Sequence, residues 1–198
     1  MPSASIKGVR LAIGDGIKDG TREIETDTSM DKKEVIKIED NFLDKKYFLN
    51  LKSMFFSHEL PWFRQSGVAT MSDEMDEEAD CFFCHIFFKN HTVCSPKIKE
   101  LSPLLDRLKD LKALMRIHAN FYPRTQDIHE HEFHKDYPFN NKTIIFSINT
   151  NNGYTKLISG EKIDSVENRL LLFDSSIEHK SSTCSDKFGR INLVVNYL

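Results

Sequence analysis

Short β-type segments separated by turn residues dominate the second half of the chain, and they constrain its fold more than any other feature. The segments are rich in Ile, Val, Leu and Phe, and turn-forming stretches such as Asn149–Gly153 divide them. No long helical pattern lies between them, as parallel strands joined by crossovers would require. The pattern predicts an antiparallel sandwich or jelly roll. The expected strands are 116–122, 143–148, 154–158, 163–166, 169–173 and 191–197.

The first half of the chain is expected to support this β-rich part. The β-branched run Glu34–Glu39 predicts a strand. In Lys45–Phe56, apolar residues recur at three- and four-residue spacing, which predicts a helix. A stripe of leucines in Lys97–Met115 predicts the clearest helix of the chain, packed on a sheet. Trp62 is interpreted as a core or lid anchor, and residues 1–30 as either an edge strand or a loose arm.

Composition narrows the functional classes. A chain of 198 residues fits one domain, and its apolar fraction of 39% supplies one sizeable core. A net charge of -3 gives no basis for a nucleic-acid surface. Because no apolar run approaches the roughly 20 residues that span a bilayer, and the N-terminus has no signal-peptide pattern, we expect a cytoplasmic protein without a membrane partner. Its four cysteines are then expected to be thiols.

Four residues form a pattern that could hold structural zinc: Cys81, Cys84, His91 and Cys94. Cys-x2-Cys is followed here by His-x2-Cys, but a zinc knuckle needs a turn between paired ligands. Phe82 and the phenylalanine after it favour a strand instead, in which the first two cysteines face opposite sides. Buried thiols are therefore favoured over a zinc site, which metal analysis after cysteine substitution would test. The acidic run 72–80 is interpreted as a solvated loop.

The sequence His134-Lys-Asp136 is the most informative functional motif. In an extended segment, residues two apart share a face, so both side chains point the same way. His179 follows 45 residues after His134 and could supply a third ligand. Two imidazoles and one carboxylate on one side of a metal form the facial triad of non-haem Fe(II) oxygenases. His129 and His131 have the opposite parity and are expected at the mouth or surface.

Arg190 opens the last expected strand and shares one face of it with Asn192, Val194 and Asn196. The alternate residues are apolar and would face a core. An arginine that points inward needs a partner, because an unpaired buried charge is very costly. A carboxylate bound through two hydrogen bonds would satisfy it, so this residue is a candidate for holding a carboxylate-bearing cosubstrate.

The order of these motifs over residues 116–197 resembles the catalytic domain of the Fe(II)/2-oxoglutarate-dependent dioxygenases. It is most similar to the prolyl-4-hydroxylase-like group, which includes small members found in phages, and residues 35–63 are similar to that group's N-terminal support. The resemblance implies a mostly β fold with supporting helices, a double-stranded β-helix of the jelly-roll, cupin-like type. It also implies a single domain, with N-terminal strands and supporting helices in 1–115 and the catalytic core in 116–198.

Carried to this chain, the resemblance implies that His134, Asp136 and His179 bind Fe(II) and that Arg190 pairs with the distal carboxylate of 2-oxoglutarate. Tyr122 and Asn120 occupy places where the family puts cosubstrate-contacting groups. Thr143 and Asn192 are weaker candidates for the same pocket.

The implied activity is hydroxylation of a substrate, coupled to conversion of 2-oxoglutarate to succinate and carbon dioxide, with ascorbate as an auxiliary reductant. The resemblance favours a peptide or protein prolyl side chain, although small molecules stay open and the substrate itself is not readable from the sequence. The alternative is a non-catalytic jelly roll that binds a metal or ligand, because a fold alone does not fix a function.

Overall fold

The computed structural model describes residues 20–26, 34–67 and 80–198, and it consists mainly of antiparallel strands. Residues 1–19 and 27–30 of the N-terminal stretch, and most of the acidic run 72–80, lie outside these residues. The strands are β1 (Thr21–Thr26), β2 (Glu34–Glu39), β3 (Phe63–Gln65), β4 (Phe82–Lys89), β5 (Thr92–Val93), β6 (Leu114–Pro123), β7 (Lys142–Ser147), β8 (Tyr154–Leu157), β9 (Lys162–Asp164), β10 (Leu170–Asp174), β11 (His179–Ser181) and β12 (Gly189–Tyr197). The helices are α1 (Lys45–Phe56), the 3-10 helix η1 (Pro96–Leu101) and α2 (Ser102–Leu105).

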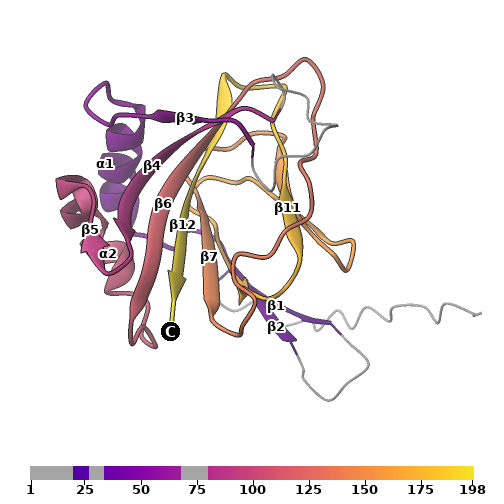
Figure 1. Cartoon of the computed structure of the whole chain (residues 1–198), viewed down its shortest axis with the longest axis horizontal. Helices are drawn as coiled ribbons and strands as arrows, with labels where there is room; N and C mark the ends of the chain where they lie inside the picture. The colour runs from indigo at the N-terminus through magenta and orange to yellow at the C-terminus, as the bar shows by residue number, and fades with distance from the viewer. Residues whose placement is uncertain (1–19, 27–33, 68–79) are drawn as a thin grey trace, which may run out of the picture.

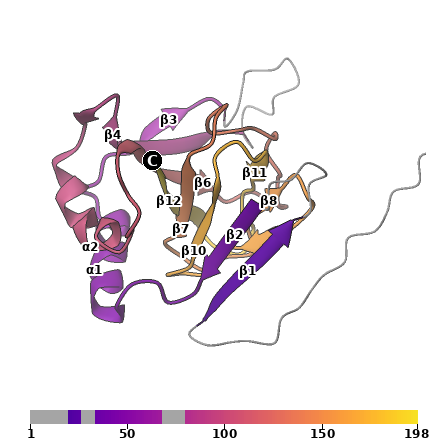
Figure 2. The ribbon, with the colours of Figure 1, turned by 90° about the horizontal axis from the view of Figure 1, so that it is seen from below.

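Two sheets and a helical layer build the molecule (Figure 1). The major sheet has nine strands in the order β1-β2-β10-β7-β12-β6-β4-β3, with β5 paired to β4. The minor sheet has the order β11-β8-β9. Seen from below, α1 and α2 lie on one side of the major sheet, and β8 and β11 lie on the other (Figure 2). The expected mostly β, antiparallel fold class is confirmed.

Each face of the major sheet carries its own core. On the helix side, alternate residues of β12 and β6 pack with Phe48, Leu51 and Phe55 of α1, and Trp62 is partly buried against the same cluster. Between the sheets, a smaller apolar cluster includes Leu157 of β8 and Phe173 of β10. The rest of the inner face of β6 and β12 is polar, so the space between the two sheets is where a site can form.

Most expected elements form where the pattern placed them, but the helix expected over Lys97–Met115 is wrong. A 3-10 helix and the four-residue α2 occupy its first part, and β6 begins at Leu114. The spacing of the leucines is mostly three residues, which suits 3-10 turns as well as an α-helix. Leu114 pairs with Tyr197 of β12, so sheet pairing overrides helix propensity at the end of the segment. The strand β11 was not anticipated.

The proposed division of the domain at residue 115 stays a prediction. Within the described ranges, no helix is long and apolar enough to span a bilayer.

Candidate metal centre

The structure brings His134, Asp136 and His179 together between the two sheets. His134 lies in the irregular segment after β6, and two backbone hydrogen bonds of 2.9 Å pair it with His179 of β11. Asp136 follows two residues later. One ligand atom from each residue lies within 4.8 Å of the others, and no second group of this kind occurs in the described part of the chain. Two imidazoles and one carboxylate at this spacing fit a facial metal triad.

Backbone carbonyls fix the orientation of both imidazoles. Nδ1 of His179 lies 3.0 Å from the carbonyl oxygen of Ile177, and Nδ1 of His134 lies 3.3 Å from that of Glu132. A carbonyl oxygen only accepts, so each Nδ1 carries the proton and each Nε2 keeps its lone pair for a metal. Burial lowers the pKa of His179 to about 4, with the neighbouring His134 contributing. The His179 imidazole is therefore neutral, as a ligand must be, near pH 7.

Three side chains hold the carboxylate of Asp136. Arg116 donates from Nη2 to Oδ1 at 2.8 Å, and Thr143 and Asn196 donate to Oδ2 at 3.0 and 2.9 Å. Burial raises the pKa of Asp136, but Arg116, His179 and the Asn196 hydrogen bond outweigh it and bring the pKa down to about 2. The carboxyl group is consequently ionised and ready to bind a cation.

Arg190 is buried, with 1% of its surface exposed, and points into the same space between the sheets. Its Nε donates to Ser165 Oγ at 2.6 Å, Nη2 to Thr155 Oγ1 at 2.9 Å and Nη1 to the carbonyl oxygen of Ser182 at 3.2 Å. Burial lowers the pKa of its guanidinium. In the described residues, no carboxylate lies within 4.0 Å of it, and two of its five N–H donors are left without a partner. This charge lacks the anion that a buried guanidinium needs.

Tyr122 and Asn120 line the inner face of β6 beside Arg190. The ring of Tyr122 lies 5.5 Å from the guanidinium carbon of Arg190, and its hydroxyl accepts from Nδ2 of Asn120 at 3.1 Å. Burial raises the pKa of Tyr122. Asn192 pairs with Asn120 across the strands, and Oδ1 of each is buried without a partner among the described residues. Unsatisfied polar atoms beside a buried cation indicate a space that a polar ligand or water fills.

The prediction of a mouth or surface position for His131 is wrong. The side chain is buried, its Nδ1 lies 2.9 Å from Ser181 Oγ, and its ring centroid lies 5.1 Å from that of Tyr122. The segment is not one regular strand, because Glu130 and His134 pair in different registers, with Ser182 just after β11 and with His179 at its start. Simple alternation therefore fails here. His129 stays partly exposed, with Nε2 3.0 Å from Asp80.

The cysteine-rich pattern does not assemble a zinc site in the structure. Cys81 is partly buried, Cys84 is buried in β4 and Cys94 is exposed, and all are free thiols. The triad is the only potential metal-binding cluster among the residues that the structure describes. Thr143, expected near a cosubstrate, instead hydrogen-bonds Asp136.

Sequence reasoning missed Arg116 and Asn196 as partners of Asp136. The signal that could have found them is the alternation of β6, where Arg116, His118, Asn120 and Tyr122 share the inner face. Polar residues on an inward face indicate a site.

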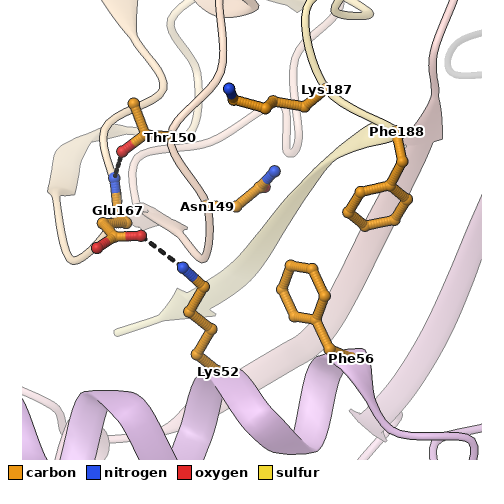
Figure 3. A pocket seen from close by; sticks show the side chains of 7 residues that line it. All are labelled: Lys52, Phe56, Asn149, Thr150, Glu167, Lys187 and Phe188. Atoms are coloured by element: carbon orange, nitrogen blue, oxygen red, sulfur yellow. Dashed lines mark hydrogen bonds and ion pairs between the residues drawn. The ribbon is translucent and has the colours of Figure 1, made fainter.

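A second hollow lies on the helix side of the major sheet (Figure 3). The rings of Phe56 and Phe188 lie edge to face on one side of it, and Lys52 reaches Glu167 at 2.5 Å. No residue of the triad lines it.

No protein-family model matches the sequence, and no curated protein matches it either. Solved structures do match. One is a prolyl hydroxylase from Trichoplax adhaerens in complex with a peptide fragment of the hypoxia inducible factor oxygen degradation domain, with a TM-score of 0.59 and 17% identity over 82% of this chain and 83% of that chain.

Two bacterial structures are similar as well. A prolyl-4-hydroxylase from Pseudomonas putida has a TM-score of 0.58 at 11% identity, covering 82% of this chain and 91% of that chain. A 2OG-Fe(II) oxygenase family oxidoreductase from Burkholderia pseudomallei has a TM-score of 0.63 at 10% identity, and the match covers 82% of this chain and 84% of that chain. At these identities the likeness shows the fold. The chain has the double-stranded β-helix of the 2-oxoglutarate-Fe(II) oxygenases, in its prolyl-hydroxylase-like form, and a His-Asp-His triad lies inside it.

Proposed function

We propose that the protein is a dioxygenase that uses Fe(II) and 2-oxoglutarate to hydroxylate its substrate, releasing succinate and carbon dioxide. One observation carries the proposal. A compact His134-Asp136-His179 triad shares an interior space with the buried Arg190, for which no acidic partner lies within reach in the described residues. A ferrous ion would satisfy the first group and a dicarboxylate the second.

The residues divide the work as follows. His134, Asp136 and His179 would hold the metal and leave its other coordination positions open. Arg190 would bind the distal carboxylate through its two unused donors, with Tyr122 and Asn120 beside it. When bound, iron and 2-oxoglutarate supply the oxidising chemistry, while the protein orients them and excludes water.

For the substrate we propose a peptide or protein prolyl side chain. Two of the structures similar in fold are prolyl hydroxylases, and one of them was solved with a peptide. The proposal extends the named activity of those proteins to this chain.

Release of succinate from 2-oxoglutarate, measured with Fe(II) and ascorbate, tests the function. We expect turnover from the intact protein and none from Asp136→Ala. Arg190→Ala should weaken 2-oxoglutarate binding by about 2–5 kcal/mol, because it removes one partner of a buried charge pair. Binding of metal and 2-oxoglutarate without any succinate would indicate a non-catalytic binding module, and an unchanged affinity in Arg190→Ala would refute the cosubstrate assignment.

A further inference from the structure

Three side chains that hold Asp136 come from one row across the major sheet. Arg116 of β6 pairs with Asn196 of β12, and Asn196 pairs with Thr143 of β7. In antiparallel strands, paired residues present their side chains on the same face. The three side chains therefore lie next to one another on one face of the sheet, where they contact the carboxylate. Ser175 Oγ lies 2.6 Å from the Thr143 hydroxyl.

The hydrogen bonds distinguish the two oxygens of that carboxylate. Among the residues that the structure describes, Oδ2 of Asp136 accepts from both Thr143 and Asn196, while Oδ1 accepts only from Arg116. Each carboxylate oxygen offers about two lone-pair positions. Oδ2 is thus fully used, and Oδ1 keeps one position open. We therefore identify Oδ1, the oxygen that Arg116 contacts, as the atom that would bind the metal.

Several contacts hold the charge of Arg116 in place. Its Nε donates to Oδ1 of Asn196 at 3.0 Å, and its guanidinium carbon lies 5.6 Å from the ring of Tyr137. Only 28% of its side chain and 9% of that of Asp136 are exposed, so solvent screens the pair weakly. The positively charged guanidinium of Arg116 consequently contacts the same oxygen of Asp136 that would bind the metal.

We propose that Arg116 is a positioning residue that orients Asp136 and, through it, keeps bound iron in the ferrous state; this inference rests on the proposed function. Oxidation of bound iron would transfer one electron from Fe(II) to an oxidant, which is dioxygen in air, and would raise the charge of the ion from two to three. A neighbouring guanidinium repels the ferric ion more than the ferrous ion. By sharing Oδ1, it also draws electron density from the ligand that would stabilise the ferric ion.

An anaerobic redox titration of the iron-loaded protein, without 2-oxoglutarate, tests this. Arg116→Gln should shift the ferric-to-ferrous binding ratio at least tenfold toward ferric iron, a fall in potential of about 59 mV for one electron. Arg116→Lys loses the fork of donors but keeps the positive charge, so its binding ratio should stay within about threefold of that of the unmodified protein. Arg107→Gln is the matched control, because it removes an arginine–carboxylate pair to Glu39 away from the triad, and it should change nothing.

An unchanged or higher potential in Arg116→Gln would overturn the inference, as would an equal fall in Arg107→Gln. If Arg116→Gln does not fold, Arg116→Met, which keeps the aliphatic stem, carries the same expectation. Iron binding to the unmodified protein and to Asp136→Ala is measured first. If iron does not bind at the triad, the proposed function fails together with this inference; if iron binds and the potential does not move, only the role of Arg116 fails.

Discussion

Arg190 lies where it does because Gly153 leaves room for it. A Cβ atom added at Gly153 would lie 2.9 Å from Cδ of Arg190 and 2.5 Å from the carbonyl oxygen of Thr183. Both distances are too short for carbon contacts, so the arginine or the backbone has to move. We expect Gly153→Ala to weaken 2-oxoglutarate binding at least tenfold and to cost about 1–3 kcal/mol of stability, as overpacking does. Calorimetric titration and urea unfolding measure the two effects.

Gly160→Ala is the control for that substitution. Apart from Gly160 and its two chain neighbours, no described residue has an atom within 4 Å of the added Cβ, although the φ of +94° makes alanine strained there. It should lower stability by about 1 kcal/mol while leaving 2-oxoglutarate affinity unchanged. Equal losses of affinity in both variants would show that Gly153 does not act through Arg190.

We expect the burial of His131 to make the stability of the protein depend on pH. Burial lowers its pKa from 6.5 to about 4. Between these values the unfolded chain binds a proton that the folded chain does not, so the free energy of unfolding falls as the pH drops from about 6.5 to about 4 and levels off below. His131→Asn should flatten this slope by up to one proton, about 1.4 kcal/mol per pH unit.

Urea unfolding with a chelator at several pH values between 7.5 and 5 measures the slope. His58→Asn is the control, because that histidine is exposed. The same slope in His131→Asn and the unmodified protein would contradict the prediction.

At the scale of single residues, the sequence predicts the three residues of the triad but not the side chains that contact them. Alternation placed His134 and Asp136 on one side, and the structure brings both to His179. Alternation can place Arg116 on the inner face of its strand, but it does not say that this side chain meets Asp136, 20 residues later, or that His131 is buried. Those contacts depend on the register between β6 and β12 and on the pairing of the 130–134 segment with β11, which are long-range properties.

Among the elements, α1 and the η1–α2 segment show when periodicity is reliable. In Lys45–Phe56 the apolar spacing mixes three and four residues, and Asp44 caps the first turn through its side chain, so the helix forms as predicted. In Lys97–Met115 the leucines are mostly three residues apart, and the end of the segment pairs with β12 instead of continuing as a helix. The local pattern therefore predicts that the leucines are buried, but it does not predict the secondary structure in which they lie.

Leu104 tests that distinction. It is fully buried in the helix-side core although α2 is only four residues long. We expect Leu104→Ala to lower the free energy of unfolding by about 2–5 kcal/mol, as for other buried leucines. Leu49→Ala on α1, where the leucine is about half exposed, should cost no more than about 0.5 kcal/mol. Similar losses in denaturant unfolding would show that the segment does not anchor the core.

For the whole molecule, the proposed ligands would tie the two sheets together. His179 belongs to the minor sheet, whereas Arg190 belongs to the major sheet and already contacts Thr155 of β8. At a hundred times its dissociation constant, a ligand adds about 2.7 kcal/mol to stability. For a chain of this size that corresponds to a rise in Tm of roughly 5–11 °C.

Thermal unfolding with Mn²⁺ alone and then with 2-oxoglutarate measures each increment. We expect Mn²⁺ and 2-oxoglutarate each to raise the Tm of the unmodified protein. Only Mn²⁺ should raise the Tm of Arg190→Gln, and neither ligand should raise that of Asp136→Ala. A 2-oxoglutarate increment that persists in Arg190→Gln would contradict the assignment of that residue.

The most direct test is a crystal structure of the protein grown anaerobically with Mn²⁺ and 2-oxoglutarate. We predict one metal ion bound by Nε2 of His134, Nε2 of His179 and a carboxylate oxygen of Asp136, with the distal carboxylate of 2-oxoglutarate on the guanidinium of Arg190. A metal ion bound elsewhere, or a 2-oxoglutarate molecule that does not touch Arg190, would contradict the proposal.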